Sequence, residues 1–106
     1  MKYQIKKNIT DRDLKNYGFR YKSESQGDYV YYLPVYKYNG KTVIYVDFVI
    51  NIEENAFIYT VKSSNDSSLY HPYYDKDSNN QVRDTIEVKV QKEIKRMIKE
   101  GIINEN

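Results

Sequence analysis

The stretch "DYVYYLPVYKYNGKTVIYVDFVINI", residues 28–52, decides the fold of this chain. At its centre, Asn39-Gly40 separates two runs rich in Tyr, Val and Ile, a pattern that predicts a hairpin with a two-residue type I′ turn. Such a turn fixes the register and pairs Tyr38 with Lys41. Because side chains alternate with period two, one face then carries only apolar or aromatic residues. We predict that this core face consists of Tyr29, Tyr31, Leu33, Val35, Ile44, Val46, Phe48 and Ile50.

The opposite face of the hairpin is mixed. Its predicted cross-strand pairs are Tyr36/Val43, Pro34/Tyr45, Tyr32/Asp47 and Val30/Val49. Pro34 cannot donate a ladder hydrogen bond, so the first strand is expected to be an edge strand or to carry a bulge there. The exposed tyrosines of this face are expected either to meet a binding partner or to pack beneath a second helix.

A turn at "EENA", residues 53–56, leads into a third strand, "FIYTVK", residues 57–62. Whether the connection has two or four residues, we expect the pairs Ile52/Phe57, Ile50/Tyr59 and Phe48/Val61, because they continue the apolar face. This register places Lys62 opposite Asp47, as a cross-strand ion pair. Residues 28–62 are thus predicted to form a three-stranded meander whose middle strand is 42–52.

Helix signals flank the meander on both sides. Thr10 as N-cap, Asp13 at the capping-box position and Gly18 as the stop predict a short helix at 11–17, after which Phe19 and Tyr21 open an edge strand. Near the other end, Asp84 and Glu87 form a second capping-box pattern. The apolar stripe behind it, expected to cover the sheet, is Ile86, Val90, Ile94, Met97 and Ile98.

The sequence is compatible with more than one start for this second helix. Alternation of Ile86, Val88 and Val90 also permits a strand there, with the helix beginning as late as Gln91. Gly101 ends the helix, and the two isoleucines after it can pack back. The predicted class is α+β: an antiparallel meander of three or four strands with a short N-terminal helix and a longer C-terminal helix packed on one face, in one domain, 1–106.

Composition excludes several kinds of site. The 106 residues include no cysteine and one histidine, which rules out disulfides, thiolate chemistry and His-based triads within one chain. "DKDSNN", residues 75–80, matches the start of a calcium loop, but Asn80 and Ile86 stand where that loop needs Gly and Glu. We therefore expect no metal, no cofactor and no enzymatic activity. Without a signal-peptide core or a bilayer-length apolar run, a cytoplasmic protein that does not enter membranes is expected.

Two groups of residues are candidates for binding. The long segment 63–82 is polar apart from an aromatic cluster, and tyrosine is enriched in protein interfaces because it offers a large contact area with a polar tip. The candidates for binding a host protein or protein complex are Tyr32, Tyr36, Tyr45, Asp47, Tyr70, His71, Tyr73 and Tyr74. The candidates for binding nucleic acid, on the predicted outer side of the C-terminal helix, are Lys89, Lys92, Lys95, Arg96 and Lys99. Because the net charge is only +2, a solvated helix exterior is the alternative to the second group.

The layout also carries a resemblance. An N-terminal "KYQIKKNITDRDLKNYGF", a Tyr-rich meander and a closing "IKRMIKEGIINEN" together resemble small accessory proteins of phages and prophages of low-GC Gram-positive bacteria. Some members of that group, anti-CRISPR proteins among them, inhibit host defence by binding a protein or masking a nucleic-acid site. The resemblance implies a non-enzymatic inhibitor that docks on a host protein, and it assigns no residue a role.

Overall fold

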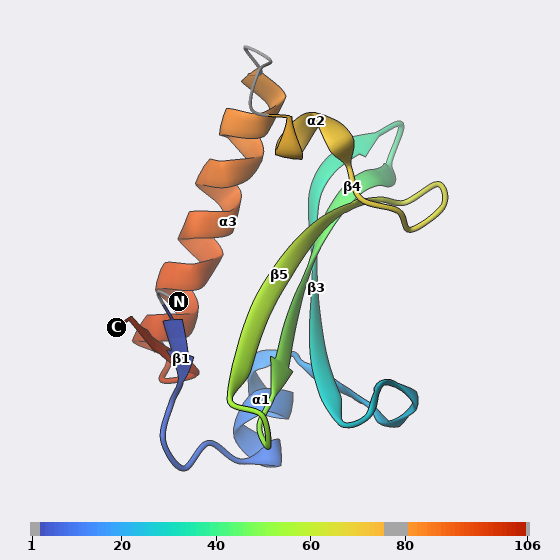
Figure 1. Cartoon of the computed structure of the whole chain (residues 1–106). Helices are drawn as coiled ribbons and strands as arrows, with labels where there is room; N and C mark the ends of the chain where they lie inside the picture. The colour runs from blue at the N-terminus through green and yellow to red at the C-terminus, as the bar shows by residue number, and fades with distance from the viewer. Residues whose placement is uncertain (1–2, 76–80, 106) are drawn as a thin grey trace.

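The structure, a computed structural model, describes residues 3–75 and 81–105. Six strands run through these residues: β1 (Tyr3–Ile5), β2 (Arg20–Lys22), β3 (Asp28–Tyr38), β4 (Lys41–Asn51), β5 (Ala56–Ser63) and β6 (Ile103–Glu105). The helical segments are α1 (Asp11–Tyr17), a 3₁₀ turn η1 (Ser23–Ser25), α2 (His71–Tyr74) and α3 (Gln81–Lys99). The predicted α+β class is confirmed (Figure 1).

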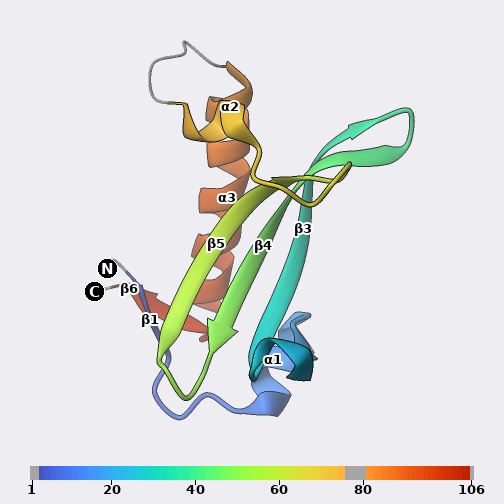
Figure 2. The same ribbon diagram turned by 45° about the vertical axis from the view of Figure 1, so that its right-hand side comes forward.

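Four strands form one antiparallel sheet in the order β2-β3-β4-β5, and α3 lies along one of its faces (Figures 1 and 2). No helix of the described residues crosses the opposite face, which we call the open face. The face under α3 is the covered face. The core lies between the covered face and the helices. It is made of fully buried side chains, among them Leu14, Val46, Phe48, Ile50, Val61, Val90, Ile94 and Met97.

A second, two-stranded sheet joins the ends of the described chain. In it β1 pairs antiparallel with β6, and Ile5 lies opposite Ile103. The predicted packing of the residues after Gly101 is confirmed, since Ile102 and Ile103 are both buried. The pairing itself was not expected, because three-residue strands at the two ends of a chain carry no local signal.

The β3–β4 hairpin has the predicted register with one correction. Tyr38 pairs with Lys41 and Tyr31 with Phe48, but Tyr36 pairs with Ile44, so the expected pairs Val35/Ile44 and Tyr36/Val43 are wrong. One extra residue on each strand, at Val35 and then at Val43, produces two opposite shifts that cancel before the turn. The expected irregularity at Pro34 is confirmed, since the first shift begins there.

The predicted β4–β5 register is wrong by two residues. Ile50 pairs with Phe57 and Val46 with Val61, because the turn occupies residues 52–55. Asn51 organises that turn: its side-chain oxygen accepts a hydrogen bond from the Glu54 N–H at 3.0 Å. A shift of two preserves the assignment of side chains to faces, so the apolar face stays intact.

The N-terminal helix is as predicted. Thr10 Oγ1 accepts a hydrogen bond from the Asp13 N–H at 3.2 Å, and the Asp13 carboxylate accepts one from the Thr10 N–H at 3.0 Å, which completes the capping box. After α1, Gly18 adopts a φ of 128°, and a β-carbon there would meet the Tyr31 ring at 3.0 Å. The expected edge strand follows as β2 and pairs with the start of β3.

The C-terminal helix starts earlier than either expected position. In the described residues α3 begins at Gln81, so Asp84 lies inside the first turn and is not a cap, and a start at Gln91 is excluded. The Thr85 side-chain hydroxyl donates to the Gln81 carbonyl at 2.9 Å, a contact that a threonine four residues along a helix can make. An acidic residue in the first turn also stabilises a helix, through the helix dipole. Asp84 can therefore favour α3 without being its N-cap, and for this reason the predicted capping box was wrong. The predicted apolar stripe faces the core.

Candidate functional site

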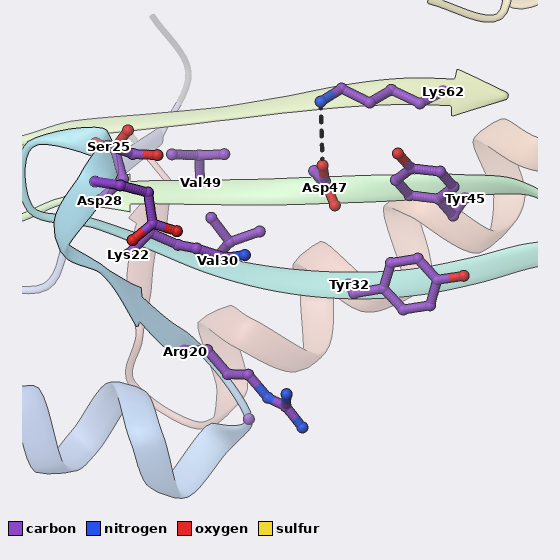
Figure 3. A pocket seen from close by; sticks show the side chains of 12 residues that line it. Arg20, Lys22, Ser25, Asp28, Val30, Tyr32, Tyr45, Asp47, Val49 and Lys62 are labelled. Atoms are coloured by element: carbon purple, nitrogen blue, oxygen red, sulfur yellow. Dashed lines mark ion pairs between the residues drawn. The ribbon is translucent and has the colours of Figure 1, made fainter. Parts of the chain in front are cut away.

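The open face carries a shallow trough of about 740 Å³ (Figure 3). It is lined by outward-facing side chains of all four strands of the main sheet, together with the η1 turn. Its lining includes Arg20, Lys22, Val30, Tyr32, Tyr45, Asp47, Val49 and Lys62. The η1 turn and the turn after β5 both extend to the side away from α3, so they border the open face (Figure 1).

Two tyrosine rings pack against each other in this trough. The Tyr32 and Tyr45 ring centroids are 4.9 Å apart with the planes tilted by 39°. Tyr32 remains 50% exposed, whereas Tyr45 is only 9% exposed. The trough therefore presents one accessible ring supported by a second, and, contrary to the alternative expectation, no helix of residues 3–75 and 81–105 covers this face.

An ion pair lies beside the rings, between Asp47 and Lys62, at 3.2 Å from carboxylate oxygen to ammonium nitrogen (Figure 3). Lys62 is paired in the ladder with Tyr45 and not with Asp47, so the contact is diagonal and not directly cross-strand as expected. The lysine side chain spans the two-residue offset. Tyr32, Asp47 and Lys62 lie on the same face as predicted, but they do not form one cross-strand row, because the ladder partner of Asp47 is Thr60 and not Lys62.

The other predicted protein-binding residues lie elsewhere. Tyr36 is 49% exposed on β3 but lies past the bulge and does not line the trough. Tyr74 accepts a hydrogen bond from the Val61 N–H at 2.8 Å, so it closes part of the outer edge of β5. Tyr70 packs against the core. The eight residues therefore do not form one surface.

Tyr73 points to the covered side of the sheet. Its hydroxyl donates to a carboxylate oxygen of Glu87 on α3, and its ring packs against the core. Burial first, and then this hydrogen bond, raise the pKa of the Tyr73 phenol. The adjacent His71 is exposed on α2. The segment before residue 76 is thus ordered by contacts with β5 and α3, whereas residues 76–80, with most of the partial calcium pattern, lie outside the described residues.

The five basic residues of α3 divide into two groups. Lys89 donates to the Val35 carbonyl at 2.6 Å, and the Arg96 guanidinium lies 4.9 Å from the Tyr17 ring centroid while it pairs with acidic neighbours on α3. Lys92, Lys95 and Lys99 are exposed. The expected contiguous basic face is therefore reduced to these three lysines.

A buried polar cluster escaped the sequence analysis. Glu93 is 9% exposed and accepts a hydrogen bond from the Tyr17 hydroxyl, which joins α3 to α1. Burial, followed by this hydrogen bond, raises the pKa of Tyr17. Glu93 was not singled out in the sequence, where it follows Lys92. Its spacing was the available signal, since position 93 falls between Val90 and Met97 on the apolar stripe.

No group of three or more potential metal ligands occurs in residues 3–75 and 81–105. The helices in these ranges also include none that is long and apolar enough to cross a membrane. The open-face trough, lined by side chains from all four strands of the main sheet, is the candidate site.

Comparisons with known proteins bear on the fold. No protein-family model matches the chain, and no curated protein matches it. Among solved structures, a DUF1831 family protein from Lactobacillus plantarum is similar, with a TM-score of 0.68 and 11% sequence identity over 98% of this chain and 86% of that chain. At this identity the likeness shows a shared fold and nothing about function.

Proposed function

We propose that this protein is a non-enzymatic binding module that docks on a protein partner through its open sheet face. The observation that carries the proposal is the half-exposed Tyr32 ring, held by Tyr45 in a trough that no described helix covers. A fixed ring loses little conformational entropy when a partner packs on it, and aromatic anchors supply much of the energy in protein interfaces.

The test compares two tyrosines of equal exposure. Tyr32 and Tyr21 are each 50% exposed, but Tyr21 lies on β2 next to Tyr29 and outside the trough. A tagged protein would be used to capture partners from a lysate of a low-GC Gram-positive bacterium, with and without nuclease. Tyr32→Ala should abolish capture of a nuclease-resistant protein, whereas Tyr21→Ala should retain it. Equal capture by both variants would refute the site.

Tyr73→Ala, at another of the predicted protein-binding residues, is a poor probe of this face. The Tyr73 hydroxyl donates a hydrogen bond to Glu87 and so links α2 to α3. Truncation of the side chain is therefore expected to weaken the packing of these helices. The role expected from the phage-protein resemblance, inhibition of a host defence protein, is part of the same proposal. It requires that the captured protein lose activity when bound, which an assay of the purified partner would decide.

Nucleic-acid binding by α3 is the second candidate, supported by the exposed Lys92, Lys95 and Lys99. Three phosphate contacts predict a weak, strongly salt-dependent interaction, with a slope of log K against log salt of about −2 to −3. Fluorescence anisotropy with single- and double-stranded oligonucleotides tests it. Binding that does not change with salt, or that survives replacement of the three lysines by glutamine, would exclude this mode.

A further inference from the structure

The rim of the trough formed by β2 carries two cations without an ion pair among the described residues. Arg20 and Lys22 lie two positions apart on this strand, so both point to the open face, opposite Val30 and Asp28 of β3. Both side chains are exposed, and the one ion pair drawn in Figure 3 joins Asp47 and Lys62. A partner can therefore reach the Arg20 guanidinium without displacing an internal contact.

Two of the three carboxylates in the trough are already engaged. Asp47 pairs with Lys62, and Asp28 accepts a hydrogen bond from the Asn51 side-chain amide at 3.1 Å. Glu24 on the η1 turn is the third. With Arg20, Lys22 and Lys62, the charges that line the trough balance. A polyanion gains little from a neutral trough, whereas a single carboxylate that meets the free guanidinium gains a charge-assisted, bidentate hydrogen bond.

Next to the cationic rim the trough has an apolar floor. Val30 pairs with Arg20 on one side and with Val49 on the other, and the exposed ring of Tyr32 follows two residues along β3. Successive side chains on one face of a strand are about 7 Å apart, and so are those on one side of an extended peptide. Tyr32 lies one strand over from Arg20 and two residues along, so the two side chains form a diagonal pair, which an acidic and an apolar side chain at positions i and i+2 of an extended peptide can contact.

From this geometry we infer that the partner inserts an extended acidic segment, in which a Glu or Asp contacts Arg20 and an apolar or aromatic residue two positions away packs on Val30 and Tyr32. The inference rests on the proposed function and specifies the partner's chemistry. Single-stranded nucleic acid fits less well, since it would pass three carboxylates and find one accessible ring, Tyr45 being nearly buried.

The experiment is a selection from a random peptide library on immobilised full-length protein. Wild-type protein should enrich peptides with Asp or Glu two residues from Phe, Tyr, Leu or Ile by about tenfold, a factor that corresponds to ~1.4 kcal/mol. Arg20→Glu and the milder Arg20→Gln should both lose this enrichment. Arg12→Glu is the matched control, because Arg12 is exposed on α1 outside the trough and its replacement should leave the enrichment intact.

Other outcomes overturn the inference. Enrichment of basic peptides, equal enrichment on Arg20→Glu, no enrichment, or displacement of the selected peptides by a thymidine oligonucleotide would each do so. Failure of this inference can be distinguished from failure of the proposed function. If uncharged peptides bind the wild type but not Tyr32→Ala, the open face is still the docking surface, and only the inference of an acidic ligand is rejected. Lysate capture unaffected by Tyr32→Ala would remove the docking surface itself.

Discussion

The two faces of the main sheet use tyrosine in opposite ways. On the covered side the hydroxyls are bonded to carboxylates: Tyr17 to Glu93, Tyr29 to Asp11 and Tyr73 to Glu87. On the open side, Tyr32 and Tyr45 pack ring against ring beside an ion pair. A buried hydroxyl must find a partner, since leaving it unsatisfied costs about 1 to 3 kcal/mol, whereas an exposed one is solvated by water. The first group fixes the fold, whereas in the second group the Tyr32 ring is half exposed and rests on the nearly buried Tyr45.

The largest expected effect is a difference in the free energy of unfolding between substitutions on the two faces. Phe48 is fully buried under α3, so Phe48→Ala should lower the free energy of unfolding by about 3 to 5 kcal/mol. Tyr32→Ala should lower it by about 1 kcal/mol or less, since it mainly removes a cross-strand ring contact. Urea denaturation followed by circular dichroism measures both values. Equal losses would show that the open face also belongs to the core.

A second test addresses the polar contacts of the covered face. Glu93→Ala leaves the buried Tyr17 hydroxyl without its acceptor and should cost about 1 to 3 kcal/mol of unfolding free energy. Glu93→Gln keeps an acceptor oxygen and should cost less. Glu100→Gln is the control on the same helix, because Glu100 is exposed and pairs with Arg96 at the surface. If Glu93→Ala and Glu100→Gln lower the free energy of unfolding equally, the contact of Glu93 with Tyr17 does not contribute to stability.

A third test uses pH. The hydrogen bond to Asp11, followed by burial, raises the pKa of Tyr29 to about 12 from an ordinary 10.0. The fold therefore holds the protonated phenol more tightly than the unfolded chain does, so this contribution is complete below pH 10 and is lost as the pH rises through about 12. Tyr29→Phe should flatten that decline in unfolding free energy. An unchanged slope in Tyr29→Phe would contradict the assignment.

The smallest expected effect belongs to the open face. The ion pair of Asp47 and Lys62 is partly exposed, with side-chain exposures of 18% and 29%, so a double-mutant cycle with Asp47→Asn and Lys62→Met should give a coupling of about 0.2 to 1 kcal/mol. The coupling should shrink as salt is added, because solvent ions screen it. A coupling that is large and independent of salt would place the pair in a drier site than the trough.

The sequence determined the central hairpin, α1 and the two faces of the sheet. Asn39-Gly40 defined the hairpin, the capping box at Thr10 defined α1, and period-two alternation assigned Tyr31 and Phe48 to the core and Tyr32 and Asp47 to the other face. These features depend on neighbours along the chain, and a two-residue error in the β4–β5 register left them unchanged.

Tertiary structure decided what each face meets. Neither the pairing of β1 with β6 nor the contact of Glu93 with Tyr17, 76 residues away in the chain, has a local signal. It also decided that Tyr73 turns toward α3 while Tyr32 stays open, and that Arg20 and Tyr32 line the same trough. Local patterns fix which way a side chain points, but which group it reaches depends on how distant elements pack, and so the trough emerged only from the folded chain.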